Sequence, residues 1–258
     1  MAKKIIQETL DAGIKPIVLT LDPVKSFTPD DREIIRTYLT INSLDVGVIH
    51  PKQYRFVARR TNQGNQLVER NIDKLFYEMP EILKEHKNVR CFTVPVYARM
   101  MRGGIISKAF FDAFVKFPDV DPNMIYVELS SDILYEELDP VKEELQALRD
   151  MGIRLAISEV GDAFCPVLRL SELEFDIAFL DPYTVASIGT DDEVKVAGNV
   201  VRFLKYLNAT VIAADMKDEA QAPYAEKLGC DGYTLMSYEP PVLSADDGGN
   251  TVVGEVNV

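Results

Sequence analysis

Eight short apolar segments with the character of β-strands recur along the chain and alternate with segments of helical periodicity. They begin near residues 16, 37, 89, 125, 153, 176, 209 and 233. Alternation of this kind predicts an α/β fold in which helices cover a mainly parallel sheet. Eight strands in a chain of 258 residues predict a single TIM-like (β/α)8 barrel. An open sheet remains the alternative, because periodicity alone does not separate the two folds.

The stretch Gly152–Asp181 shows this alternation most clearly. Ile153–Ser158 is a short apolar run, Cys165–Leu173 has helical spacing, and Asp176–Leu180 is apolar again. The economical interpretation is a parallel strand pair joined by a crossover helix. Residues 158–163 then form a loop at the carboxyl end of the first strand, where the active sites of parallel α/β folds lie. We therefore expect this loop to carry site residues.

Three other segments give local predictions. Gly47–Pro51 is expected to be a turn that leads into a helix. Leu134–Met151 is expected to be a helix broken by Asp139 and Pro140, and Asp191–Leu207 is expected to be one long helix.

The domain organisation follows from composition. With 47% hydrophobic residues, the chain can bury one full core, and we expect residues 1–241 to form a single barrel domain. Residues 242–258 are rich in small and polar side chains, which predicts a flexible tail.

The charge and the rare residues exclude several classes of protein. The formal net charge is −13, with the acidic excess after residue 102, which argues against nucleic-acid binding. No apolar run approaches the roughly 18 residues of a membrane span and no signal-peptide pattern is present, so we expect no membrane partner and a cytoplasmic location. The three cysteines and two histidines have neither disulfide nor metal-ligand spacing. We therefore expect a reducing compartment and no cofactor.

Six segments, in this order and at this spacing, carry a resemblance to a known family. They are Pro16–Val18 (PIV), Gly47–Ala58 (GVIHPKQYRFVA), Val127–Ser130 (VELS), Leu148–Ala156 (LRDMGIRLA), Val211–Gln221 (VIAADMKDEAQ) and Leu228–Asp231 with Pro241. They resemble the QPI opening, the GxIxPxxFxxxA segment, the ExTE strand, the LRxxGxxxA run, the AEGVE segment and the closing segment of EAL domains. These domains are barrel-shaped phosphodiesterases that hydrolyse cyclic di-GMP. The resemblance also implies that one strand of the barrel runs antiparallel.

The residues that the resemblance places in the active site are mostly replaced. By spacing, Arg36 stands where the EAL signature has its metal-binding Glu, and Thr40 stands where the same strand has its substrate-contacting Arg. Pro95 stands at the metal-binding Asn. Glu128 is kept, but Ser131 stands at the second acid of its motif.

The second half of the site departs in the same way. Ser158 and Glu159 stand at the two aspartates of the DDFG loop, and Phe179 stands at the catalytic Lys. Ala214 stands at the first acid of AEGVE and Lys217 at the second, while Thr234 and Leu235 replace a Gln-Gly pair. Of the acids, Glu128, Glu159 and Asp181 remain. Three carboxylates do not make two closed oxygen cages for divalent cations, so we expect no metal and no phosphodiesterase activity.

The resemblance therefore implies a catalytically inactive EAL module that acts through protein interaction in bacterial regulation, such as motility, biofilm or cell-cycle control, with a protein partner that the sequence does not identify. One alternative is a cyclic di-GMP receptor without hydrolysis, in which Arg36 contacts a phosphate and Tyr38 or Phe179 stacks on a guanine. We favour instead an ion pair of Arg36 with Glu128 or Glu159 that fills the vacated pocket. The second alternative is an enzyme of altered chemistry in the same barrel mouth.

Active EAL domains dimerise around the DDFG loop and the helix after it. The resemblance thus implies a homodimer whose surface includes Asp162, Phe164, Pro166 and Arg169.

Overall fold

The computed structural model describes residues 17–28, 32–43, 47–161, 165–193 and 195–236, together with Lys4 and Gln7. The expected tail at 242–258 and the dimer residues Asp162 and Phe164 lie outside these ranges.

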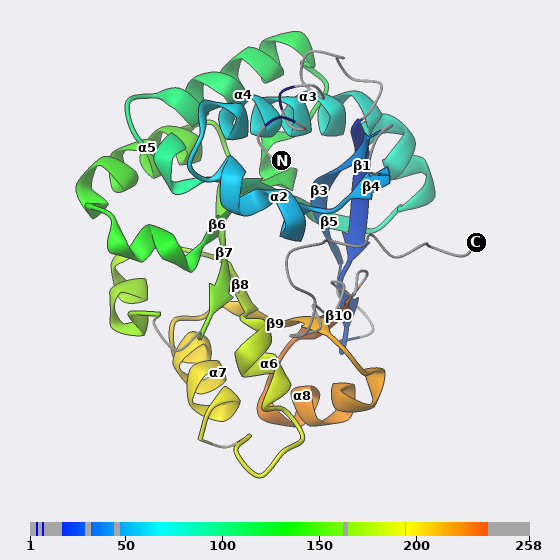
Figure 1. Ribbon diagram of the computed structural model, residues 1–258, viewed down its shortest axis with the longest axis vertical. Helices are drawn as coiled ribbons and strands as arrows, with labels where there is room; N and C mark the ends of the chain where they lie inside the picture. Colours follow the sequence, from blue (N-terminus) through cyan, green and yellow to red (C-terminus); the bar gives the residue numbers. More distant parts are fainter. Residues whose placement is uncertain are drawn as a thin grey trace, which may run out of the picture.

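The strands form one barrel-shaped sheet (Figure 1). From β3 to β10 all neighbours are parallel, in the order β3-β5-β6-β7-β8-β9-β10. β1 is antiparallel to β3, and after one residue, Val24, the chain continues as β2, which is antiparallel to β10. The run β1–β2 therefore joins the two ends of the sheet, which confirms the predicted barrel with an antiparallel strand. The strands are β1 (Ile17–Pro23), β2 (Lys25–Ser26), β3 (Glu33–Ser43), β4 (Gly47–Ile49), β5 (Val89–Val96), β6 (Ile125–Ser130), β7 (Arg154–Val160), β8 (Ile177–Leu180), β9 (Thr210–Met216) and β10 (Gly232–Leu235).

Helices surround this sheet (Figure 1). Their apolar faces pack on the outward-facing side chains of the strands, and Phe76, Phe110 and Phe114 form an aromatic cluster between two of them, with ring centroids 5.1 to 6.4 Å apart. The helices are α2 (Pro51–Ala58), α3 (Asn62–Glu85), α4 (Ile105–Lys116), α5 (Leu138–Asp150), α6 (Pro182–Ala186), α7 (Ala197–Tyr206) and α8 (Ala222–Leu228). Short 3-10 turns lie at 98–100, 122–124, 131–135, 167–172 and 219–221.

The inside of the barrel is filled by a separate apolar cluster. Because side chains alternate along a strand, every second residue points inward. The inward residues that pack together are Val24, Ile34, Cys91, Tyr126, Ala156, Ile177, Phe179, Ile212 and Ala214. The barrel is thus closed by packed side chains, and a pocket can open only at an end of it.

Several local predictions are wrong in instructive ways. Gly47–Ile49 is not a turn but strand β4, because it pairs antiparallel with the end of β3. Asp139 and Pro140 do not break a helix: they lie in the first turn of α5, where a missing amide hydrogen removes no intrahelical bond. The preceding residues form a separate 3-10 turn.

The central stretch also differs in detail. Residues 158–160 belong to β7, with Ser158 paired to Ser130 of β6 and Val160 paired to Leu180 of β8, so the first half of the predicted loop is strand. Residues 167–172 form a 3-10 turn in place of an α-helix. Helix α7 begins only at Ala197, and α6 was not predicted, because five residues are too short for a periodic pattern.

In the part of the chain that the structure describes, no helix is both long enough and apolar enough to span a bilayer.

Candidate functional site

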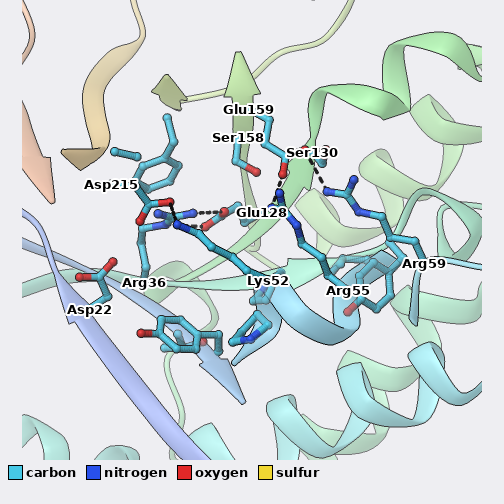
Figure 2. Close-up of a pocket in the computed structure, with 18 of the residues that line it drawn as sticks. Asp22, Arg36, Lys52, Arg55, Arg59, Glu128, Ser130, Ser158, Glu159 and Asp215 are labelled. Atoms are coloured by element: carbon cyan, nitrogen blue, oxygen red, sulfur yellow. Dashed lines mark hydrogen bonds and ion pairs between the residues drawn. The ribbon is translucent and has the colours of Figure 1, made fainter. Parts of the chain in front are cut away.

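A pocket opens at the carboxyl ends of the parallel strands, with α2 along one side of it (Figure 2). Strands β3, β5, β6, β7, β8 and β9 each contribute residues to its lining, and β1 contributes Asp22. This is the end of the barrel at which parallel α/β barrels bind their ligands. The pocket contains four cationic and five acidic side chains: Arg36, Lys52, Arg55, Arg59, Asp22, Glu128, Asp132, Glu159 and Asp215.

The centre of the pocket holds an ion pair on an aromatic ring. Arg36 on β3 donates two hydrogen bonds to Glu128 on β6, from Nη2 to Oε1 at 2.7 Å and from Nε to Oε2 at 3.3 Å. The Arg36 guanidinium also lies over the ring of Phe179, with Cζ 4.4 Å from the ring centroid. Burial opposes the charge of Arg36, but the carboxylate of Glu128 outweighs it and raises the pKa of Arg36. Phe179 is fully buried, so it offers no free face for stacking.

A second ion-pair group ties α2 to the end of β7. Arg55 and Arg59 both donate to the carboxylate of Glu159, Arg59 with Nη2 2.9 Å from Oε2. Ser130 on β6 donates to the same oxygen at 2.5 Å (Figure 2). Nη1 of Arg59 also lies 3.7 Å from Oδ2 of Asp132. Burial opposes ionisation of Glu159, but the two guanidinium groups outweigh it and lower the pKa of this carboxyl. Glu159 therefore stays ionised.

A third pair crosses the pocket from α2 to β9. The ammonium of Lys52 lies 3.0 Å from Oδ2 of Asp215. Asp215 and Glu159 both have a left-handed backbone, with φ of 58° and 59°, which non-glycine residues rarely adopt. Asp215 stands at the glycine position of the segment that resembles AEGVE. Asp tolerates the left-handed region better than most residues, so this chain keeps the turn and gains a carboxylate facing α2.

Asp22 is the one acid of the pocket that has neither an ion pair nor a hydrogen bond from its side chain to the described residues. It lies on β1 opposite Arg36. Burial raises the pKa of this carboxyl to about 6, with smaller contributions of opposite sign from Arg36 and Asp215.

Six of the eight residues predicted for a degenerate pocket line it together: Arg36, Glu128, Ser158, Glu159, Phe179 and Ala214. The other two do not. Thr40 is buried and its hydroxyl lies 2.8 Å from that of Thr20 on β1. Asp181 caps α6 by accepting from the amide of Tyr183 at 2.7 Å. Of the expected pair partners of Arg36, the structure selects Glu128, because Glu159 is held by α2.

Two of the four residues predicted for a dimer surface can be placed. Pro166 precedes the 3-10 turn at 167–172. Arg169 lies in that turn and donates to the backbone oxygens of Leu134 and Glu136, which ties the turn to residues 131–135. Their role in a dimer remains a prediction.

Six charged residues of the pocket were not predicted from the sequence: Asp22, Lys52, Arg55, Arg59, Asp132 and Asp215. Residues 52, 55 and 59 are spaced by three and four, so they share one face of a helix, and this signal was available. Asp215 directly follows Ala214, so its place in the segment that resembles AEGVE was also a signal, whereas Asp22 had none, because only the pairing of β1 with β3 brings it to the pocket.

The residues present do not fit the divalent cations that hydrolysis in this kind of barrel requires. Both oxygens of Glu128 accept from Arg36, and Pro95 and Ala214, which also line the pocket, offer no side-chain oxygen. Among the described residues, no three or more His, Cys, Asp or Glu side chains are grouped so that they could hold a metal ion. We derive no metal-dependent step for this pocket.

The fold and the pocket define a TIM-like barrel that is closed by the antiparallel run β1–β2 and has a charged mouth at the carboxyl ends of its parallel strands. The EAL domain family model matches residues 5–234. The chain belongs to the EAL domain family.

Known relatives and solved structures agree with this assignment. The chain is 24% identical over 116 residues to the bifunctional diguanylate cyclase/cyclic di-GMP phosphodiesterase MucR of Pseudomonas aeruginosa, covering 43% of the chain and 16% of that protein. It is 20% identical over 185 residues to the oxygen sensor protein DosP of Escherichia coli, covering 71% of the chain and 23% of that protein. The chain thus spans less than a quarter of these relatives. A structure of the PaMucR phosphodiesterase in a c-di-GMP complex superimposes with a TM-score of 0.79 at 20% identity, over 91% of this chain and 94% of that one.

Proposed function

We propose that this chain is a non-hydrolysing EAL domain that acts as a regulatory, protein-interacting module in cyclic di-GMP-related signalling, such as motility, biofilm or cell-cycle control. The observation that carries the proposal is the position of Arg36. Its guanidinium holds both oxygens of Glu128 in the centre of the pocket, where it would repel a divalent cation.

The remaining acids support the same proposal. Phosphodiester hydrolysis by two metal ions needs oxygen ligands that activate a water and stabilise the phosphoryl charge. Glu159 is held by two arginines and Asp181 caps a helix, so neither acid is free to complete such a set. These engagements also weaken the case for an enzyme of altered chemistry, because an acid, a base or a nucleophile must be able to reach a substrate.

One observation favours a second candidate, a receptor that binds cyclic di-GMP without hydrolysing it. Lys52, Arg55 and Arg59 form a cationic face of α2 along the pocket, and phosphates bind to such groups. Each of these cations already has a carboxylate partner, however. A dianionic ligand would have to displace the acids, which makes this candidate the second one.

The test incubates the purified chain with cyclic di-GMP and Mg²⁺ or Mn²⁺, with chromatography for the linear product. The PaMucR phosphodiesterase domain serves as the positive control. We expect no product above the protein-free blank. Product that increases with protein concentration and disappears with chelator would overturn the proposal.

Calorimetric titration with cyclic di-GMP decides between the two candidates. We expect no heat of binding. Binding that Arg55→Ala and Arg59→Ala each weaken would establish the receptor in place of the interaction module.

A further inference from the structure

The charges of the pocket divide into two groups that differ in balance. Around Glu159, the two cations Arg55 and Arg59 face the two carboxylates of Glu159 and Asp132, so this half is neutral overall. The other half contains Arg36, Lys52, Asp22, Glu128 and Asp215. There, three carboxylates face two cations, so one negative charge remains uncompensated.

That charge belongs to Asp22. The carboxylate of Glu128 is taken by Arg36, and the carboxylate of Asp215 is taken by Lys52. Asp22 has no hydrogen bond or ion pair from its side chain within the described residues, and Figure 2 shows its carboxylate at the edge of the group with no interaction drawn. A half-buried carboxylate without a partner is costly, because water is partly removed and nothing replaces it.

We propose that the barrel mouth binds an organic cation, an ammonium or guanidinium group, on the carboxylate of Asp22. The proposal rests on the proposed function, since it names the chemistry that a partner would bring to the pocket. One positive charge completes this half of the pocket, whereas a dianionic ligand increases its negative charge.

The lining favours an organic cation over a metal ion. Tyr38, two residues after Arg36 on β3, also lines the pocket, and aromatic faces attract ammonium and guanidinium groups. A hard divalent cation needs several oxygen ligands in one shell, and the neighbouring oxygens of Glu128 already accept from Arg36.

The groups around Asp22 give the site a defined pH dependence. Those that face it are Arg36 on β3, Glu128 on β6, Lys52 on α2 and Asp215 on β9. Because the pKa of Asp22 is raised to about 6, its carboxylate is ionised at pH 7.5 and about nine-tenths protonated at pH 5. His50, which also lines the pocket, has a pKa lowered by burial and is neutral at pH 7.5.

The experiment titrates the full chain with butylguanidinium chloride by calorimetry at pH 7.5 and pH 5.0. We expect saturable binding at pH 7.5 and about tenfold weaker binding at pH 5.0. Asp22→Asn should weaken binding at pH 7.5 by about tenfold and remove its pH dependence. Asp119→Asn makes the same charge change at an exposed turn and should bind like the parent chain.

Asp22→Asn should fold. A carboxyl whose pKa is higher in the folded than in the unfolded state makes the protein less stable as pH rises through that range, and the amide, which carries no charge, avoids this loss.

A second arm of the experiment uses a blocked pentapeptide with a central arginine between alanines. The same peptide with uncharged citrulline in place of the arginine is its control. Tighter binding of the arginine peptide than of butylguanidinium identifies a protein side chain as the source, and equal binding identifies a small molecule.

Absence of binding by both guanidinium probes would overturn the proposal, as would binding that Asp22→Asn leaves unchanged. A parallel titration with cyclic di-GMP separates this failure from failure of the proposed function. If neither the cations nor cyclic di-GMP bind, only the inference about Asp22 fails. If cyclic di-GMP binds and the cations do not, both fail.

Discussion

Arg36 shows how one residue sets the charge at the centre of a pocket. It occupies the place of a metal-binding Glu in the resemblance, and it reverses the charge at the centre of the barrel mouth. A buried guanidinium is stable there only because Glu128 accepts from it in two places and Phe179 lies beneath it. The side chain of Arg36 is 18% exposed and that of Glu128 is 7% exposed, so solvent screens the ion pair only weakly.

Removing one partner of this pair should lower the free energy of unfolding more than removing both charges together. We expect Arg36→Met to lower the free energy of unfolding by about 3 kcal/mol, because it leaves Glu128 buried and unpaired. Glu128→Gln should also destabilise the fold, and the double variant should recover about 1 kcal/mol or more relative to the sum of the single changes. Urea unfolding followed by circular dichroism measures all three, since the chain has no tryptophan. Strict additivity would show that the two residues do not stabilise each other.

At the scale of the element, the position of α2 decides the electrostatics of the pocket. Lys52 and Arg55 of this eight-residue helix, with its C-cap residue Arg59, pair with acids on β9 and β7. The end of the helix packs closely on the first turn of α3. Gly64 in that turn makes this contact possible. A Cβ atom there would lie 2.0 Å from the backbone oxygen of Ala58, the last residue of α2.

Gly64→Ala should therefore destabilise the protein, although helix propensity alone predicts that it stabilises α3. Alanine ordinarily stabilises a helix by about 0.5 to 1 kcal/mol relative to glycine. Here the clash with backbone should destabilise the chain by about 1 to 3 kcal/mol. Gly198→Ala in α7 is the matched control, because its Cβ would meet its nearest neighbours at 3.4 and 3.5 Å, and it should be neutral or slightly stabilising. Equal effects of the two changes on the urea midpoint would contradict this account of the α2–α3 contact.

At the scale of the molecule, closure of the barrel depends on a very short seam. β2 has two residues and pairs with Gly232 and Tyr233 at the start of β10. A Cβ at Gly232 would lie 2.7 Å from the backbone oxygen of Lys25 and 2.9 Å from Cγ1 of Val24. The seam therefore needs a residue without a side chain.

Gly232→Ala should open this seam first. We expect a loss of about 1 to 3 kcal/mol in the free energy of unfolding. The amide of Phe27, which donates to the backbone oxygen of Asp231 at 3.0 Å, should exchange with solvent faster than amides in β6. Hydrogen exchange measures both sites, and unchanged protection of Phe27 would show that the seam tolerates a methyl group.

The fold was largely predictable, and the candidate site was predictable only in part. Segments with the character of strands mark all eight main strands, and those of β6 and β8 are apolar throughout much of their length because these strands are buried on both faces. Short elements such as β4 and α6 were missed because their formation depends on partners far along the chain. Six of the predicted pocket residues do lie together, since consecutive parallel strands bring their carboxyl ends to one rim.

The alternation of strands and helices, together with the order of the six motif-like segments, was enough to predict the barrel and the family, because both depend on the pattern of residues along the chain. The pairing of the charges, in contrast, depends on how the chain folds. The pairs Arg36–Glu128, Arg55–Glu159 and Lys52–Asp215 join residues between 92 and 163 positions apart. Coulomb interactions depend on distance in space and on burial, which the folded barrel sets. The same reason leaves Asp22 as the pocket acid without a partner among the described residues.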